Sequence, residues 1–280
     1  MTDLVSIFDN ESLERLRKET RLDPEHIRAL RNGLFKKFEA DDVALDRFPG
    51  RDRVRCHSLE LFRRCDSQVD GASKLLLKTK AGMLIESVIL RIATGRSTLC
   101  VSSQVGCAAA CDFCATGKMG IAQNLSSAEI LDQVVQTGQL LATEGRRLQN
   151  IVFMGMGEPF HNKENLFETL DALTAPNLFN RSPGSILVST VGVPDGMLQC
   201  ADRFPKVNLA LSLHSVNPDV RRELIPLTKK HPLEELQETI RELNRRQGIP
   251  VMIEYLMLAG KNDFPDDASH LVEWLYGLNV

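Results

Sequence analysis

From Leu99 onward, short apolar segments alternate with amphipathic segments, and this alternation restricts the fold more than any other feature of the sequence. Five consecutive pairs of an expected strand and an expected helix can be read: 100–103 with 126–142, 151–154 with 164–174, 186–190 with 194–202, 207–213 with 232–247, and 251–258 with 266–277. This spacing indicates βαβ units and a parallel sheet. Asn279 and Val280 would begin a sixth strand.

The first 98 residues follow a different pattern. Helical periodicity is present over 11–19 and 24–38, and Asp23 before Pro24 is a favourable helix start. Residues 46–72 are charged and irregular, so we expect no regular element there. The run SKLLLKTKAGMLIESVILRI at 73–92 predicts two strands joined by a turn at 80–82.

Charge and hydropathy exclude few functions. The net charge of −3 gives no sign of nucleic-acid binding by itself, but 19 Lys and Arg against 16 Asp and Glu in residues 1–100 make the front of the chain weakly basic. No apolar run approaches the about 20 residues of a membrane span. The N-terminus lacks the basic and then apolar pattern of a secretory signal. We expect a cytoplasmic protein with no membrane contact.

Four of the seven cysteines fall within fifteen residues, and such a cluster needs a chemical reason. An odd number of cysteines without a signal peptide argues against a disulfide framework. Cys107, Cys111 and Cys114 have CxxxCxxC spacing, so three thiolates could ligate three irons of a cubane and leave the fourth iron open. The alternative is a zinc knuckle, for which His161 or His214 would have to supply the fourth ligand.

Polar motifs follow the expected strands, at the ends where parallel α/β folds place their functional groups. The cysteine loop follows the first strand, GMGEP (155–159) the second, Ser189 the third and SLHS (212–215) the fourth. Glycines in GMGEP permit a tight turn close to a ligand. Taken singly, GMGEP could be a plain turn, Ser189 a backbone cap and His214 a structural residue.

The cysteine spacing, with Phe113 before the third cysteine, resembles the radical S-adenosylmethionine (SAM) superfamily. The wider stretch TLCVSSQVGCAAACDFCATGKMG (98–120), together with GMGEP, VSTVG (188–192) and LALSLHSVNPDVRRELIPL (209–227), resembles the RlmN/Cfr family of radical SAM RNA adenine methyltransferases. The resemblance runs from about residue 74 to the C-terminus.

The resemblance implies a fold and two cofactors. We expect an α/β protein with an incomplete (β/α)6 radical-SAM partial barrel over 99–280, a β-hairpin extension over 73–98 and a helical accessory domain over 1–72 that could contact RNA. A 4Fe-4S cluster would be held by Cys107, Cys111 and Cys114. The implied contacts to SAM are the following: Gly157 and Glu158 for its amino group, and Ser189, Ser212, Leu213 and His214 for its carboxylate and ribose.

Two further residues gain catalytic roles from the resemblance. Glu86 matches the family's proton acceptor, and Cys100 matches the thiol that resolves a protein–RNA crosslink through a transient disulfide bond. Glu86 shares a strand face with Leu84, Val88 and Leu90, where a carboxylate is costly unless it is paired or functional. The alternative is a glutamate at the hairpin edge that faces solvent.

The implied function is methylation of an adenine ring carbon, with carbon 2 favoured over carbon 8, in 23S rRNA and also in tRNA. We expect a monomer that receives electrons from a donor such as flavodoxin. The family has a further strand bearing an Asn and a C-terminal methyl-carrying Cys, and this sequence reaches Val280 without either. We therefore expect a fragment of a longer methyltransferase. The alternatives are a different or methylation-deficient radical SAM protein and a non-enzymatic RNA- or metal-binding remnant.

Overall fold

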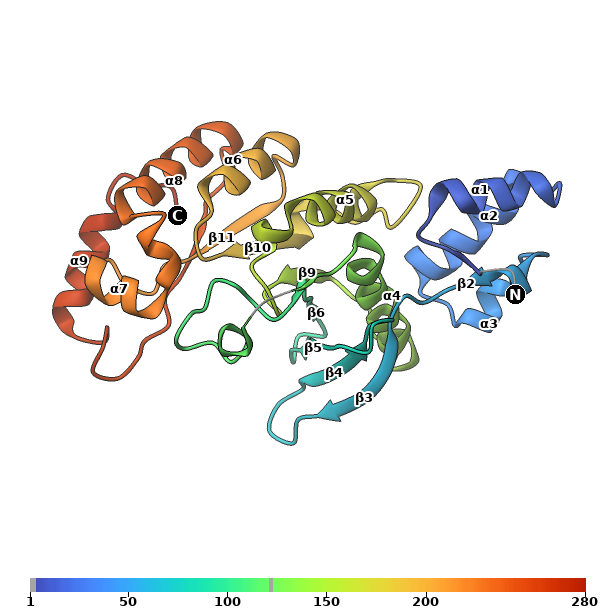
Figure 1. The fold of residues 1–280 in the computed structure, drawn as a ribbon, viewed down its shortest axis with the longest axis horizontal. Coiled ribbons are helices and arrows are strands. Elements are labelled where there is room, and N and C mark those ends of the chain that lie inside the picture. The colour runs from blue at the N-terminus through green and yellow to red at the C-terminus, as the bar shows by residue number, and fades with distance from the viewer. Residues whose placement is uncertain (1–3, 121–122) are drawn as a thin grey trace. The chain divides into compact units, whose positions relative to one another are not determined.

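The computed structural model describes residues 4–120 and 123–280, and these residues form two compact units. The first unit consists of the described residues up to Val101 together with 125–151 and 168–182, and the second of 102–124, 152–167 and 183–280 (Figure 1). The chain therefore passes five times from one unit to the other. This division differs from the predicted domain boundaries, which stay a prediction. None of the helices in the described ranges has the length and hydropathy of a transmembrane segment.

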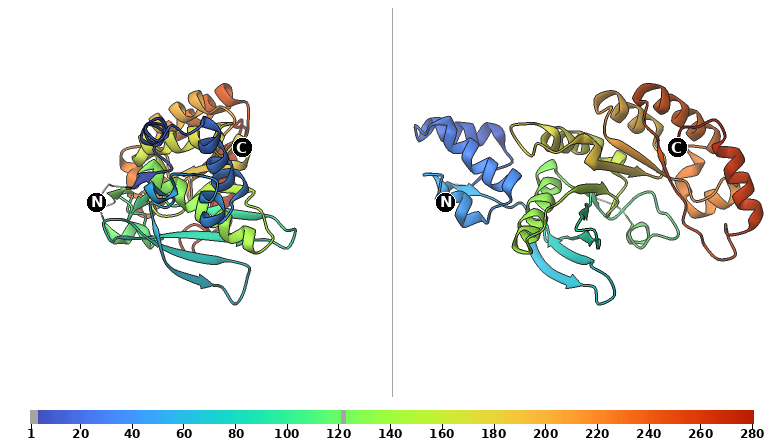
Figure 2. Two further views of the ribbon diagram at one scale, coloured as in Figure 1. Left: turned by 90° about the vertical axis from the view of Figure 1, so that its right-hand side faces the viewer. Right: turned by 180° about the vertical axis from the view of Figure 1, so that it is seen from behind.

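Helices make up most of the N-terminal part of the first unit, which is drawn in blue in Figure 2. The α-helices are α1 (Asn10–Glu19), α2 (Pro24–Arg31) and α3 (Asp41–Leu45). Asp9 and Asp23 cap the first two, because their carboxylates accept from the Ser12 amide at 3.0 Å and the Glu25 amide at 2.7 Å. Both predicted helix starts are confirmed within one residue.

Only the first part of the helix predicted over 24–38 is α-helical, namely α2. It continues as a π-helical turn, η1 (Asn32–Lys37), and ends at Phe38, which adopts a left-handed conformation with φ of 54°.

The first unit contains an antiparallel sheet in the order β6-β5-β4-β3. Its strands are β3 (Glu60–Asp66), β4 (Ser73–Lys78), β5 (Leu84–Arg91) and β6 (Ser97–Cys100). The predicted hairpin is confirmed, with its turn at Gly82. The expectation of an irregular segment over 46–72 is wrong, because β3 forms there. All seven residues of β3 are exposed at the sheet edge, so no alternation of buried and exposed residues marks the strand. The expected strand 100–103 is also misplaced, since β6 ends at Cys100 and runs antiparallel to β5.

Helix α4 (Ser127–Thr143) packs on one face of this sheet. The face consists of buried side chains that include Ile85, Ser87 and Ile89, and the Ser87 hydroxyl donates to Gln133 of α4 at 2.7 Å. A capping box formed by Ser126 and Glu129 begins the helix.

His57 connects the segment after α3 to α4. Its Nε2 lies 2.9 Å from Asp41 and its Nδ1 lies 2.7 Å from the fully buried Asp132. Burial alone would lower the pKa of His57, but hydrogen bonds to the two carboxylates outweigh it and raise the pKa to about 10. The imidazole is therefore protonated at neutral pH, and Asp132 also accepts from the amides of Ser58 and Leu59.

The second unit contains a parallel sheet in the order β12-β11-β10, which confirms the predicted βαβ pattern. Its strands are β10 (Ile186–Thr190), β11 (Asn208–Ser212) and β12 (Met252–Glu254), and β9 (Asn150–Phe153) continues the order beside β10. The helices that follow these strands are α5 (Lys163–Thr174), α6 (Pro194–Arg203), α7 (Pro218–Leu224), α8 (Leu233–Gln247) and α9 (Pro265–Leu275).

Two details of this unit differ from the sequence-based expectation. The strand expected over 251–258 ends at Glu254, and Asn279 and Val280 form no strand; the Asn279 carbonyl accepts from the Val251 amide at 3.1 Å. Helix α7 was not expected. The remaining strands are two-residue pairs: β1 (Val5–Ser6) with β2 (Val54–Arg55), and β7 (Gln104–Val105) with β8 (Gln123–Asn124).

Candidate functional site

The three cysteines of the CxxxCxxC motif line one cavity of about 230 Å³ in the second unit. Their loop folds tightly, since the Cys114 amide donates to the Cys111 carbonyl at 3.2 Å. A Cβ atom on Gly117 would lie 2.8 Å from backbone atoms of Cys111, so only glycine permits this packing. Cys107 and Cys111 are buried and Cys114 is half-buried.

The arrangement of the thiols fits the ligand set of a 4Fe-4S cluster. Within residues 4–120 and 123–280, no three His, Cys, Asp or Glu side chains converge in a way that could hold one metal ion. Ligands of a zinc knuckle must converge on a single ion. Thiolates of a cubane each bind a different iron, and three cysteines around one cavity fit that requirement.

Burial controls the ionisation of these thiols. It raises the pKa of Cys107, and it raises the pKa of Cys111 to about 12, with a further contribution from the neighbouring thiols. The positive charge of Arg221 opposes the shift at Cys111. Ligand binding by cysteine requires the thiolate, so iron must displace the proton. All seven cysteines are free thiols, and the transient disulfide implied for Cys100 stays a prediction.

The GMGEP motif follows β9 and contributes Gly157 and Glu158 to the same cavity. Gly157 has φ of 105°, and a Cβ atom there would lie 2.6 Å from Gln104, so the position requires glycine. The Gln104 side chain accepts from the Glu158 amide at 2.9 Å. This loop is therefore fixed against the segment that leads into the cysteine loop.

Glu158 is a buried carboxylate, 2% exposed, that connects this loop to the end of β10. Its Oε1 accepts from the Phe160 amide at 3.1 Å and from the Thr190 hydroxyl at 2.8 Å, and its Oε2 accepts from the Val191 amide at 3.0 Å. Burial raises the pKa of Glu158 to about 7, although these hydrogen bonds oppose the shift. A cation in the cavity would favour the ionised form.

Ser189, Ser212 and Glu254 lie at the C-terminal ends of three adjacent strands, and all line the cavity. Ser212 and Glu254 are the last residues of β11 and β12, and Ser189 is the last but one of β10. Glu254 Oε2 accepts from the Ser189 hydroxyl at 2.9 Å and from the Ser212 hydroxyl at 2.6 Å. The carboxylate therefore fixes both hydroxyl groups.

Leu213 and His214 lie beside the cavity without lining it. His214 adopts a left-handed conformation with φ of 58°, and its Nδ1 accepts from the Leu256 amide at 3.1 Å. Its ring meets Phe113, a cavity residue, edge to face at 4.8 Å. Burial, followed by the charge of Arg221, lowers the pKa of His214 to about 4, so the ring is neutral.

Glu86 and Cys100 both belong to the antiparallel sheet of the first unit. Val88 pairs with Cys100, and Glu86 lies two residues from Val88, so Glu86 and Cys100 share one face of the sheet. That face is the one opposite α4. The sequence-based view of an apolar environment needs correction, because Glu86 is half-exposed and lies 3.0 Å from Lys74 Nζ.

Sequence reasoning missed Glu254 and Arg221. The expected strand ran on to residue 258, which placed Glu254 in mid-strand instead of at the strand end. Arg221 is one of two adjacent arginines in α7 and is 1% exposed, whereas Arg222 is exposed. The spacing of Arg221, Leu224 and Ile225 at i, i+3 and i+4 was the available signal, because such residues share a helix face.

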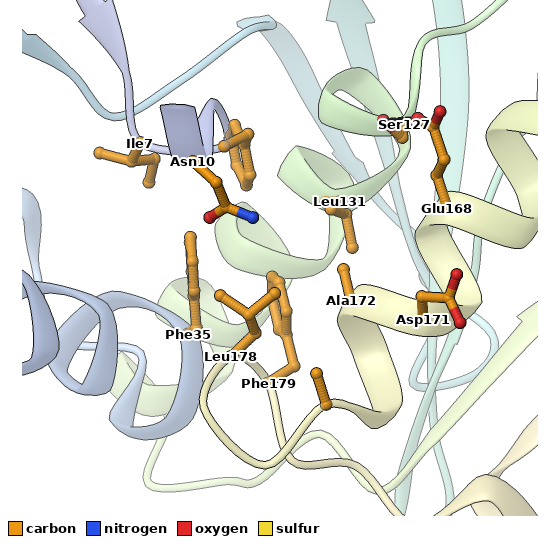
Figure 3. Close-up of a pocket in the computed structure, with 12 residues that line it drawn as sticks. Ile7, Asn10, Phe35, Ser127, Leu131, Glu168, Asp171, Ala172, Leu178 and Phe179 are labelled. Carbon is orange, nitrogen blue, oxygen red and sulfur yellow. Dashed lines mark hydrogen bonds between the residues drawn. The ribbon is translucent and has the colours of Figure 1, made fainter. Parts of the chain in front are cut away.

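A second cavity, of about 340 Å³, lies within the first unit (Figure 3). Apolar side chains such as Ile7, Phe35, Leu131 and Phe179 line much of it, and Glu168 and Asp171 lie at one side. None of the residues predicted for the site lines it.

The sequence of the chain is similar to those of known proteins. Residues 101–275 match the Radical SAM superfamily. The chain is 59% identical over 276 residues to a probable RNA methyltransferase of Rhodopirellula baltica, covering 99% of this chain and 73% of that protein. It is 37% identical over 275 residues to a probable dual-specificity RNA methyltransferase RlmN of Aquifex aeolicus, covering 94% of this chain and 78% of the relative.

The chain spans a smaller share of the length of other relatives. The chain spans 62% of a probable dual-specificity RNA methyltransferase RlmN 2 of Protochlamydia amoebophila, with 41% identity. Among solved structures, a radical SAM methyltransferase from Sphaerobacter thermophilus superposes with a TM-score of 0.91 and 33% identity, covering 98% of this chain and 83% of the other. This similarity confirms the predicted fold class.

Proposed function

The chain belongs to the radical SAM superfamily and, within it, to the RlmN-type RNA methyltransferases, and from this premise we propose that it methylates carbon 2 of an adenine in 23S rRNA and in tRNA. One observation carries the proposal: Cys107, Cys111 and Cys114 line a single cavity together with Gly157, Glu158, Ser189 and Ser212. A cluster ligand set and polar groups suited to a charged nucleoside cofactor therefore meet in one place.

Three cysteines would hold the 4Fe-4S cluster, and SAM would lie against it. When both are bound, they would supply one-electron reductive chemistry at the cavity. The protein positions the cofactor and limits the access of water to the cavity.

Glu158 would bind the amino group of SAM. Its Oε1 already accepts two hydrogen bonds, but Oε2 accepts only one and has a lone pair for an ammonium donor. An ammonium group would also stabilise the ionised carboxylate that burial disfavours.

Ser189 and Ser212 would accept hydrogen bonds from SAM. Each hydroxyl has one proton, and both protons are directed to Glu254. The serine oxygens can therefore offer lone pairs to a ligand, and this suits the ribose hydroxyls, which can donate. The SAM carboxylate only accepts, so it suits these serines less well.

Replacing Glu254 by glutamine should weaken SAM binding about tenfold, because the amide cannot accept both serine protons as strongly as a carboxylate does. Calorimetric titration of the iron-loaded protein with SAM would measure the effect. Glu234→Gln, an exposed change on α8, is the matched control and should bind SAM as the parent chain does. Equal affinity in Glu254→Gln would mean that the serine hydroxyls need no fixed orientation.

Glu86 would accept the proton released from the target base, and Cys100 would resolve the covalent intermediate with RNA. Their location on one face of the antiparallel sheet supports a joint role. A target adenine must leave its stack to reach a buried site. The weakly basic N-terminal region would contact RNA, and the electron donor would be a protein of the flavodoxin class. We propose a monomeric, cytoplasmic enzyme.

The methylated product tests the function directly. We expect 2-methyladenosine in 23S rRNA and tRNA when the complete reading frame containing this sequence is expressed in a bacterium without adenine carbon methyltransferases of its own. Mass spectrometry of nucleoside digests, with 2-methyl and 8-methyl standards, would detect it. The 8-methyl isomer would contradict the carbon 2 assignment, and 5′-deoxyadenosine without any methylated adenosine would contradict RNA methylation.

A further inference from the structure

Arg221 of α7 is a buried charge without a carboxylate partner. The side chain donates to the carbonyl of Leu213 at 3.1 Å, to the hydroxyl of Thr228 at 2.5 Å, and to the carbonyls of Val191 at 2.6 Å and Ser212 at 3.4 Å. All four acceptors are neutral. Over the described ranges 4–120 and 123–280, no Asp or Glu forms an ion pair with it.

Helix α7 lies directly against the cysteine loop. The Leu224 carbonyl accepts from the Asp112 amide at 2.9 Å. Leu224 and Ile225 share a buried apolar cluster with Cys107 and Cys111. The helix that carries Arg221 is therefore part of the wall that supports two of the three cluster ligands.

A buried cation without a counter-ion is unfavourable, because burial removes its hydration. Hydrogen bonds to neutral carbonyls reduce this cost but leave the net charge in place. Three thiolates bring negative charge to the loop beside α7 when they hold a cluster. An added electron increases that negative charge, and a cation held in a medium of low dielectric constant favours the added electron.

We propose that Arg221 is a positioning residue whose buried positive charge compensates the cluster held by Cys107, Cys111 and Cys114 and makes its one-electron reduction more favourable. The inference rests on the proposed function, because it requires a 4Fe-4S cluster on this loop. In the reaction considered, the cluster gains one electron from dithionite and no bond forms or breaks in the protein.

The charge can be separated from the hydrogen bonds by two matched substitutions. Arg221→Lys keeps the charge and Arg221→Gln removes it, while both shorten the side chain and lose most of the four contacts. Arg222→Gln is the control, because Arg222 is the adjacent residue of α7, is exposed and pairs with Asp219 at 2.7 Å.

Each variant is reconstituted anaerobically, its iron is quantified, and the cluster potential is measured by redox titration followed by electron paramagnetic resonance. We expect the equilibrium constant for reduction to fall at least tenfold in Arg221→Gln relative to Arg221→Lys, which is about 59 mV for one electron. The Arg222→Gln variant should match the parent chain.

Equal potentials in Arg221→Lys and Arg221→Gln would overturn the inference and leave the proposed function intact. Loss of iron from both variants, with full iron in Arg222→Gln, would also overturn it, because Arg221 would then be a scaffold for the loop. A parent chain that binds no cluster would contradict the proposed function itself.

Discussion

Replacement of Cys111 by alanine is expected to remove the cluster, and with it all reductive chemistry. The parent chain should bind about four irons after anaerobic reconstitution, and the variant less than about one. Cys111 is buried, and the remaining two thiols cannot hold three irons of a cubane. Iron and sulfide analysis, together with the visible absorption spectrum, would measure the loss. Equivalent losses are expected for Cys107→Ala and Cys114→Ala.

Two other cysteines provide matched controls for this change. Cys200 of α6 is fully buried, so Cys200→Ala removes a buried thiol without touching the loop. Cys65 of β3 is exposed and controls for the loss of an accessible thiol. Both variants should keep about four irons. A Cys111→Ala protein with full iron would overturn the assignment of the site.

Glu158→Ala is expected to weaken SAM binding by about 2–4 kcal/mol, or roughly 30- to 1,000-fold, because the ammonium group would lose a buried ionic partner. Equilibrium dialysis with labelled SAM would measure the affinity. The iron content should not change, since Glu158 is not a cluster ligand. Thr190→Val is the control, because it removes one hydrogen bond to Glu158 at 2.8 Å but keeps the carboxylate.

The pH dependence of SAM affinity tests the role of Glu158 in a second way. Burial raises the pKa of Glu158 to about 7, and only the ionised form can pair with an ammonium. Below pH 7, binding must first expel a proton, so affinity should fall by up to about tenfold for each unit of decreasing pH. The neutral Glu158→Gln variant should show no such slope. An affinity that is flat between pH 5.5 and 7 in the parent chain would mean that Glu158 serves only the backbone turn.

Apart from α7, the strands and helices of the second unit were predictable because their apolar periods are strong and their connections are regular. Parallel strands end at one edge of a sheet, so a linear sequence could place Gly157, Glu158, Ser189 and Ser212 together before any coordinates existed. The cysteine loop was predictable for a chemical reason, since thiols at this spacing have few other uses.

Other features of the fold and the site depend on contacts between residues far apart in the chain, and these contacts leave no local pattern in the sequence. Strand β3 is exposed along its whole length, so only its pairing with β4 defines it. Glu254 gains its role from two serines, 42 and 65 residues earlier, that donate to it. The face of β5 that carries Glu86 looked buried in sequence because it holds leucine and valine, yet α4 covers the opposite face.

The discontinuous course of the first unit affects when the protein can assemble during translation. That unit includes residues 168–182, so its N-terminal helices and hairpin cannot complete their packing until about two thirds of the chain has been synthesised. The cavity needs Glu254 as well. At about 5–20 residues per second, the ribosome takes roughly 7–28 s to proceed from Cys114 to Glu254. During this interval the nascent chain presents its thiols without the finished wall of the cavity, so the complete site can form only after Glu254 has been synthesised.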